Sequence, residues 1–188
     1  YLPAGQDVIA DADLVIDQVL PYPLIHALVM AADQDKPLLA RKGDALCTEC
    51  HSDIADLMKA KKVKHTALDD GCTSCHKPHG GANPKLLAEA GQALCFQCHD
   101  DIADKVQKSP VAHAALASAK GCASCHSPHA ADQEKLLLAP EKEGCLGCHE
   151  KIVTPEMTVL HGPIRDGSCT ACHDPHGAIE AKLLKESF

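Results

Sequence analysis

The chain has 188 residues and a formal net charge of −8, and it contains no Trp, two Tyr and two Phe. Its Lys and Arg residues are interspersed rather than clustered, which excludes the basic patch that a nucleic-acid partner requires. No run of about eighteen apolar residues is present, so the sequence predicts no transmembrane helix. With few aromatic side chains to fill a core, the twelve Cys and thirteen His residues are the features to explain.

Residues 1–35 contain no Cys and predict an N-terminal arm. Two apolar segments, 7–20 and 24–32, are separated by Pro21 and Pro23. The chain starts at Tyr1, without an initiator Met or a charged and apolar signal segment. We therefore expect a mature, processed form.

Every Cys lies in the pattern C-x-x-C-H. The six motifs are Cys47-Cys50-His51, Cys72-Cys75-His76, Cys95-Cys98-His99, Cys122-Cys125-His126, Cys145-Cys148-His149 and Cys169-Cys172-His173. Two thiols at this spacing can reach the two vinyl groups on one edge of a porphyrin, and the next residue is then held under the iron as its proximal ligand. The motifs predict six covalently attached haem c groups, with the twelve Cys as thioether residues and the six His as proximal ligands.

Three alternatives were weighed for the same cysteines. The gaps between consecutive pairs are close to zinc-ribbon spacing, but a zinc ribbon needs no His after the second Cys. A disulfide framework gives those His residues no role either. Thioredoxin-like dithiols need a βαβ context, which this sequence lacks. The pattern favours haem over all three.

The chain repeats. His65, His113 and His161 follow one another at intervals of 48 residues, and each lies between two motifs. Lys-Leu-Leu segments recur at 85–87, 135–137 and 182–184. We divide the chain into three tandem two-haem units, residues 36–83, 84–133 and 134–188.

Hydrophobic periodicity predicts short helices over 52–61, 85–94 and 100–107, with Ser52 or Asp53 as a possible N-cap of the first. No alternating apolar run indicates a sheet. The expected fold class is mostly irregular with short α-helices, a small all-α arrangement whose core consists of the covalently bound haems.

Six further His residues match the six distal iron positions. They are His65, His79, His113, His129, His161 and His176, of which His79, His129 and His176 end the phrase C-H-x-P-H. His79 lies three residues after His76, so it cannot easily reach the opposite face of that iron. We therefore assign His79 and His65 to the first and second haems. The same logic assigns His129 and His113 to the third and fourth haems, and His176 and His161 to the fifth and sixth.

On these motifs, residues 36–188 resemble the doubled-CxxCH multihaem cytochromes, including electron-carrier subunits of nitrite- and metal-reducing systems. The resemblance implies an electron carrier rather than an enzyme, exported to the periplasm or cell exterior, whose partners are redox proteins or extracellular acceptors. Bis-histidine ligation leaves no open iron position. The alternative is a multihaem reductase with one substrate-accessible haem, for which the usual CxxCK motif is absent.

His26 has no place in the repeat. It is either a spare histidine in an arm that packs over the first unit, or a ligand or contact to a haem of a neighbouring subunit. The second possibility follows a resemblance to the extracellular cytochrome filaments of metal-reducing bacteria. It would give a head-to-tail homopolymer.

Overall fold

The computed structural model describes residue 39 and residues 41–187. The chain divides into two compact parts, residues 1–42 and residues 43–188. The described helices and strands begin at Asp44, in the second part. The predicted N-terminal arm and His26 lie outside the described residues.

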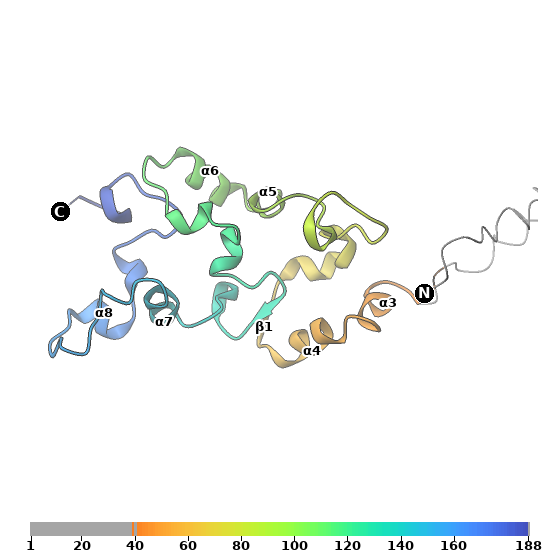
Figure 1. The fold of residues 1–188 in the computed structure, drawn as a ribbon, viewed down its shortest axis with the longest axis horizontal. Helices are drawn as coiled ribbons and strands as arrows, with labels where there is room; N and C mark the ends of the chain where they lie inside the picture. The colour runs from red at the N-terminus through yellow and green to blue at the C-terminus, as the bar shows by residue number, and fades with distance from the viewer. Residues whose placement is uncertain (1–38, 40, 188) are drawn as a thin grey trace, which may run out of the picture. The chain divides into compact units, whose positions relative to one another are not determined.

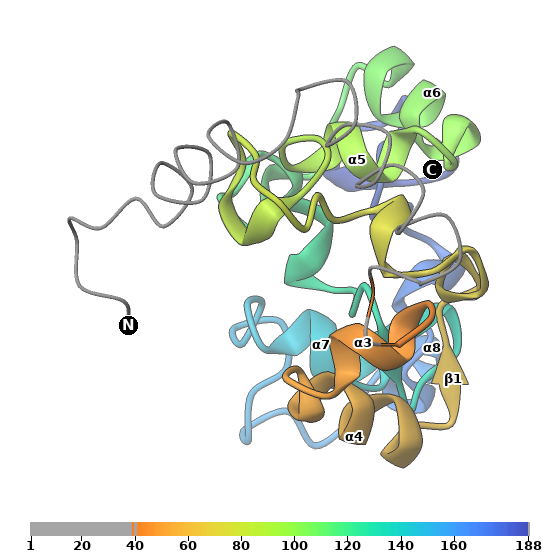
Figure 2. The ribbon, with the colours of Figure 1, turned by 90° about the vertical axis from the view of Figure 1, so that its right-hand side faces the viewer.

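Short helices joined by long irregular segments make up the second part (Figures 1 and 2). The described α-helices are α3 (Asp44–Thr48), α4 (Ser52–Ala60), α5 (Gln92–Phe96), α6 (Asp100–Lys108), α7 (Glu141–Leu146) and α8 (Gly162–Asp166). The 3₁₀ turns are η1 (Thr66–Asp70), η2 (Cys72–Ser74), η3 (Pro84–Leu86), η4 (Ala114–Ala117), η5 (Gly121–Ser124), η6 (Glu134–Leu136), η7 (Cys169–Ala171) and η8 (Ala181–Leu183). The largely irregular fold with short helices agrees with the fold class predicted from the sequence.

Helices α4 and α6 confirm two of the three predicted helices. Each begins directly after a motif His, which occupies the N-cap position without a side-chain cap bond. The predicted cap at Ser52 or Asp53 is therefore wrong, because the helix already includes both residues. Asp53 instead lies in the first turn of α4, where a carboxylate complements the helix dipole. In the third repeat unit no helix begins directly after His149; the next one is α8, at Gly162. Pro155 lies in the intervening segment and is a residue that breaks helices.

The predicted helix over 85–94 is wrong. Lys85 and Leu86 have positive φ angles of 58° and 56°, whereas a right-handed helix requires negative φ. The same left-handed pair recurs at Lys135 and Leu136, and again at Lys182 and Leu183. The Lys-Leu-Leu segment is therefore a tight turn, and α5 begins only at Gln92.

Successive repeat units meet through short antiparallel pairings that the sequence did not predict. Strand β1 (Val63–Lys64) pairs with β2 (Ala130–Ala131), with Val63 opposite Ala131. The next pair of units has a single bridge, in which Val111 and Ala178 exchange backbone hydrogen bonds of 3.1 and 2.9 Å. Segments this short are below the length at which alternation can be recognised.

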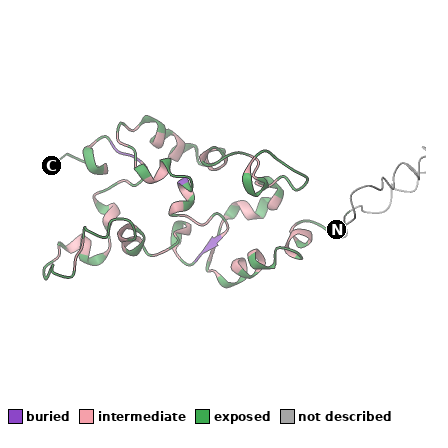
Figure 3. Cartoon of the chain, viewed as in Figure 1, coloured by how far each residue is buried: buried purple, intermediate pink, exposed green. Residues whose placement is uncertain are grey.

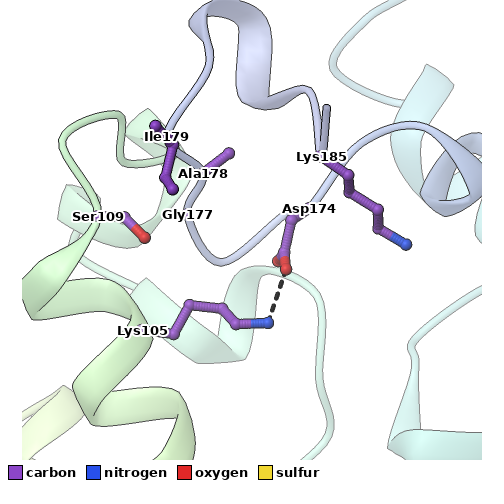
Figure 4. Close-up of a pocket in the computed structure, with 7 residues that line it drawn as sticks. All are labelled: Lys105, Ser109, Asp174, Gly177, Ala178, Ile179 and Lys185. Carbon is purple, nitrogen blue, oxygen red and sulfur yellow. Dashed lines mark hydrogen bonds and ion pairs between the residues drawn. The ribbon is translucent and has the colours of Figure 1, made fainter. Parts of the chain in front are cut away.

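Each of these contacts also includes an ion pair. Lys61 Nζ lies 2.6 Å from Asp132 Oδ2, and Lys105 Nζ lies 2.7 Å from Asp174 Oδ2. Figure 4 shows the second pair beside Ser109 and Gly177, in a shallow pocket that the second and third repeat units line together. Both pairs are partly exposed to solvent, so they specify which segments meet more than they stabilise the fold.

Burial is concentrated at the contacts between units (Figure 3). Among the described residues, the only buried hydrophobic side chains are those of Ala130, Ala131 and Ala178. No large apolar side chain in this part of the chain is fully buried. The described residues therefore form no conventional core, and a large apolar group bound between these segments would provide the missing contact area. No described helix is long and apolar enough to cross a membrane.

Candidate haem-ligand array

All six motifs share one backbone geometry. The motif His donates its backbone N–H to the carbonyl of the first Cys, at distances from 2.9 Å for His51 to 3.1 Å for His99 and His173. This bond closes one helical turn, so the two cysteines and the His of a motif are held within that single turn. The first, third and fifth motifs form the turn at the ends of α3, α5 and α7, and the others form it in η2, η5 and η7.

The Lys-Leu-Leu turns fix the imidazole orientation in the second, fourth and sixth motifs. Nδ1 of His76 lies 2.9 Å from the carbonyl oxygen of Lys85. The equivalent distances are 2.7 Å from His126 to Lys135 and 2.8 Å from His173 to Lys182. A carbonyl only accepts hydrogen bonds, so each Nδ1 donates its proton and Nε2 keeps a free lone pair for a metal. The repeat of these segments is visible in the sequence, but their role in orienting the imidazoles is not.

Four pairs of imidazole rings face each other. His65 and His99 have ring centroids 6.1 Å apart and planes 10° from parallel. The other pairs are His76 with His129 at 6.2 Å, His113 with His149 at 6.0 Å, and His126 with His176 at 6.2 Å. A metal–imidazole bond is about 2 Å long and the ring centre lies about 1 Å behind the nitrogen, so two imidazoles on opposite sides of one metal have centroids about 6 Å apart. The pairs therefore have the separation of two axial ligands of one iron.

Each pair joins a motif His to a His from a neighbouring repeat unit. His65 of the first unit faces the motif His99 of the second, and His129 of the second faces the motif His76 of the first. The pairing within units that the sequence favoured is therefore not the arrangement that these rings adopt. His113 and His176 likewise pair across units, with His149 and His126. His129 and His176, which each end a C-H-x-P-H phrase, thus face the motif His of another unit and not that of their own.

The backbone pairing between units explains why each of these histidines faces a motif His of the other unit. Val63 pairs with Ala131, and the backbone N–H of His65 donates to the carbonyl of His129 at 2.9 Å. The two histidines therefore lie next to each other on the two paired segments. Each imidazole faces the motif His of the other unit. Val111 and Ala178 pair in the same way, each two residues from its histidine, and His113 and His176 each face a motif His of the other unit.

Burial keeps two of these imidazoles neutral. Burial, followed by His76 and His65, lowers the pKa of His129. Burial also lowers the pKa of His176, an effect that Asp174 partly opposes and His126 reinforces. A neutral imidazole is the form that binds a metal, so both residues are in the state that ligation requires.

The thiols of successive motifs lie next to one another. Burial and the Cys122 thiol raise the pKa of Cys95 to about 11, with a smaller effect from Cys75. Burial and Cys169 raise the pKa of Cys145 to about 11, again with a contribution from Cys125 of the preceding unit. In the first unit, burial, Asp44 and Cys47 raise the pKa of Cys72 to about 12. Each motif thus has a thiol near enough to a thiol of the next motif for one to affect the pKa of the other.

Polar side chains join the two motifs within a repeat unit. The backbone N–H of Cys72 donates to Asp44 Oδ1 at 2.9 Å. In the third unit, the backbone N–H of Thr170 donates to Glu141 Oε1 at 2.6 Å. In the second unit, Gln92 Nε2 donates to the carbonyl of Leu116. Each donor or acceptor at the start of α3, α5 or α7 thereby anchors the loop of the following motif.

The cysteines form no other site in the described residues. All twelve are free thiols. Within residues 41–187, no three His, Cys, Asp or Glu side chains gather into a group that could hold a metal by themselves. The zinc and disulfide alternatives therefore lack a site in this part of the chain, whereas the repeated Cys–Cys–His turn and the facing imidazoles fit haem.

These features place the chain in the class of multihaem c-type cytochromes. The family model of the doubled CXXCH motif matches residues 65–104, 113–154 and 161–187, more than half of the chain. The chain belongs to this family. Each matched segment starts at the His that precedes a C-H-x-P-H phrase. The paired motifs indicate covalently bound haem c and electron transfer. A comparison with curated proteins gives no match.

Proposed function

We propose that this protein conducts electrons through six covalently attached haem c groups, each ligated by two histidines. The motif histidines are the proximal ligands. The distal ligands are His129 for the second haem, His65 for the third, His176 for the fourth and His113 for the fifth. The four facing ring pairs, at 6.0 to 6.2 Å, are the observation that carries this proposal.

Bis-histidine ligation favours a carrier over an enzyme. With both axial positions filled, an iron binds a substrate only by losing a ligand. The hydrogen bonds from Nδ1 to the Lys85, Lys135 and Lys182 carbonyls hold the ligands in place and increase their basicity. Such ligation favours the ferric state, so we expect low reduction potentials.

The thiol series supports conduction along the whole chain. Because a haem c is anchored at its cysteines, neighbouring thiols bring the anchored porphyrin edges close together. Cys47 lies by Cys72, Cys75 by Cys95, and Cys95 by Cys122. The contacts of Cys125 and Cys145 continue the series into the third unit. One electron would enter from a reduced donor and leave to an oxidised acceptor, with no atom transferred.

The location and partners follow from the same proposal. Haem c is attached outside the cytoplasm, so the protein would be exported and act in the periplasm or at the cell surface. A net charge of −8 suits a basic or neutral docking partner, either a redox protein or an extracellular acceptor. A head-to-tail homopolymer would extend the conducting path beyond one molecule.

The test is to count the haems and their ligands in the purified exported protein. Intact mass and the pyridine haemochrome spectrum should give six haems per chain. Electron paramagnetic resonance of the oxidised protein should show low-spin signals of bis-histidine iron. Fewer covalent haems, or stoichiometric zinc in their place, would refute the proposal. So would a dominant high-spin signal in which a substrate such as nitrite becomes bound and reduced.

A further inference from the structure

The contact between repeat units follows one register. Val63 and Val111 each lie two residues before the His that crosses the contact, and they are 48 residues apart. Their partners, Ala131 and Ala178, each lie two residues after the crossing His of the other unit. The two contacts between units are therefore equivalent. The same register predicts one further backbone edge of this kind in the third unit and one in the first unit.

The edge of the third unit is formed by Val159. It follows Val111 by 48 residues and again precedes a His by two. Its side chain is 88% exposed, and Met157, the counterpart of the packed Ser109, is 46% exposed. No backbone pairing of Val159 is found among the described residues.

The complementary edge lies in the first unit. Gly80 and Gly81 occupy the positions of Ala130 and Ala131, which are 2% and 4% exposed. Both glycines are exposed, and a Cβ on Gly80 would meet nothing within 4 Å. This edge has the residues of the buried side of a unit contact, but no strand from the described part of the chain pairs with it.

The ligands at the two ends show the same complementarity. His79 is exposed, whereas its counterparts His129 and His176 are half-buried against a motif His. His173 holds its Nδ1 on the Lys182 carbonyl, as His76 and His126 do on theirs. Among residues 41–187, however, no imidazole faces His173 or His79.

We propose that a second copy of this chain docks head to tail, with its Gly80–Gly81 edge against the Val159 edge of the first. This inference rests on the proposed haem ligation. In this register, His79 of the second copy becomes the distal ligand of the iron held by His173. His161 of the first copy comes alongside the His51 motif of the second. The sixth haem is therefore completed only by assembly, and the contact, being heterologous, continues into an open fibre.

The contact between two copies is expected to be small, so little of its affinity would come from buried apolar area. An unpaired strand edge is a template for another strand, and each known contact in this chain buries only small side chains such as Ala178. Metal ligation and backbone pairing would therefore contribute most of the affinity. A charge at the centre of the edge should abolish association, because it would be buried without a partner.

Two variants of the haem-loaded full chain test the docking. Val159→Asp and Gly81→Glu each spoil one edge and leave the other intact. Gly81 is open to substitution, since a Cβ there would meet neighbouring atoms only at 3.9 Å or more. By sedimentation, wild type should polymerise and each variant alone should be monomeric. Mixed together, they should form a one-to-one dimer through the two intact edges. Lys59→Gln is the control for charge. It lowers the net charge by the same amount as Val159→Asp, but on a lysine whose side chain is 79% exposed, and it should polymerise like wild type.

Three results would each overturn the inference. If the mixture stays monomeric, or if either single variant still forms fibres, the two edges are not partners. A wild-type chain that is monomeric at all concentrations would have the same consequence. The proposed function would stand in each case, provided that six covalent haems are counted.

The iron ligands give a second readout. Monomeric Val159→Asp should show a high-spin ferric signal of at least about one haem in six. That signal should be absent in wild-type fibres. His79→Ala should show it as well, and added imidazole should convert it to low spin. If the Val159→Asp monomer is entirely low-spin, its sixth haem already has a ligand and the inference fails.

Discussion

His65 and His99 belong to different repeat units, yet their imidazole rings face each other 6.1 Å apart and 10° from parallel. Three further pairs have the same relation. Four of the additional histidines therefore face a motif His of a neighbouring unit. Under the proposed ligation, the ligands that close the irons would also hold the units together.

We predict that His65→Ala removes a ligand from the haem of Cys95 and Cys98. The oxidised protein should gain a high-spin signal of about one haem in six. In a Cys95→Ala/Cys98→Ala background, which lacks that haem, His65→Ala should add no high-spin signal. In a Cys72→Ala/Cys75→Ala background it should still add one. If His65→Ala instead adds the signal only in the Cys95→Ala/Cys98→Ala background, then His65 is a ligand of the second haem, within its own unit.

Much of the site could be predicted because it is local in sequence. The Cys–Cys–His turn depends only on residues such as Cys72 and His76, four positions apart, and so its ligands could be read directly. The partner of His65 could not, because it depends on the pairing of Val63 with Ala131 across a long loop. A two-residue strand leaves no periodic signal, and the sequence offers no rule that assigns one unit's His to another.

The turn at Lys85 was missed for a different reason. Left-handed backbone is usually signalled by Gly or Asn, and here two ordinary residues adopt it in succession. The surrounding bonds impose the conformation: the Lys85 carbonyl accepts from His76 Nδ1, and Lys77 donates to the Leu86 carbonyl at 2.7 Å. Helix propensity favoured the wrong structure because these tertiary bonds outweigh it.

The Lys135 carbonyl should tune the iron held by His126. Lys135→Pro fixes φ near the negative value of proline, which is incompatible with the observed 55°, so the hydrogen bond to Nδ1 is lost. A less basic imidazole stabilises ferric iron less well. One reduction potential should rise, on the order of tens of millivolts, in a spectroelectrochemical titration. Lys135→Gly, which permits the left-handed turn, should leave all potentials unchanged; an equal shift in both variants would exclude the carbonyl as the cause.

Asp44 should make the first repeat unit sensitive to acid. The backbone N–H of Cys72, which donates to the Asp44 carboxylate, lowers the pKa of Asp44 below its ordinary value of 3.8. The stabilisation is therefore fully present above that value and is lost as the pH falls through the lowered pKa of the folded state. Solvent screens the group, so the effect on the free energy of unfolding should be below about 1 kcal/mol. In guanidinium unfolding titrations between neutral and strongly acidic pH, Asp44→Asn should weaken the dependence of the free energy of unfolding on pH. A curve of unchanged shape would show that other carboxyls carry the dependence.

Gly177 should be required for the contact between the second and third units. A Cβ at this position would lie 2.7 Å from the Cβ of Ser109, at a φ of 157°. Gly177→Ala should therefore lower the free energy of unfolding by about 1–3 kcal/mol, and Ser109→Gly in the same chain should recover part of the loss. Gly80 has a similar φ of 148° with nothing within 4 Å, so Gly80→Ala isolates the backbone strain and should cost about 1 kcal/mol or less. These measurements belong in the Val159→Asp background, where assembly does not contribute. Equal losses at Gly177 and Gly80, with no recovery from Ser109→Gly, would mean that backbone strain, and not packing between units, fixes the glycine.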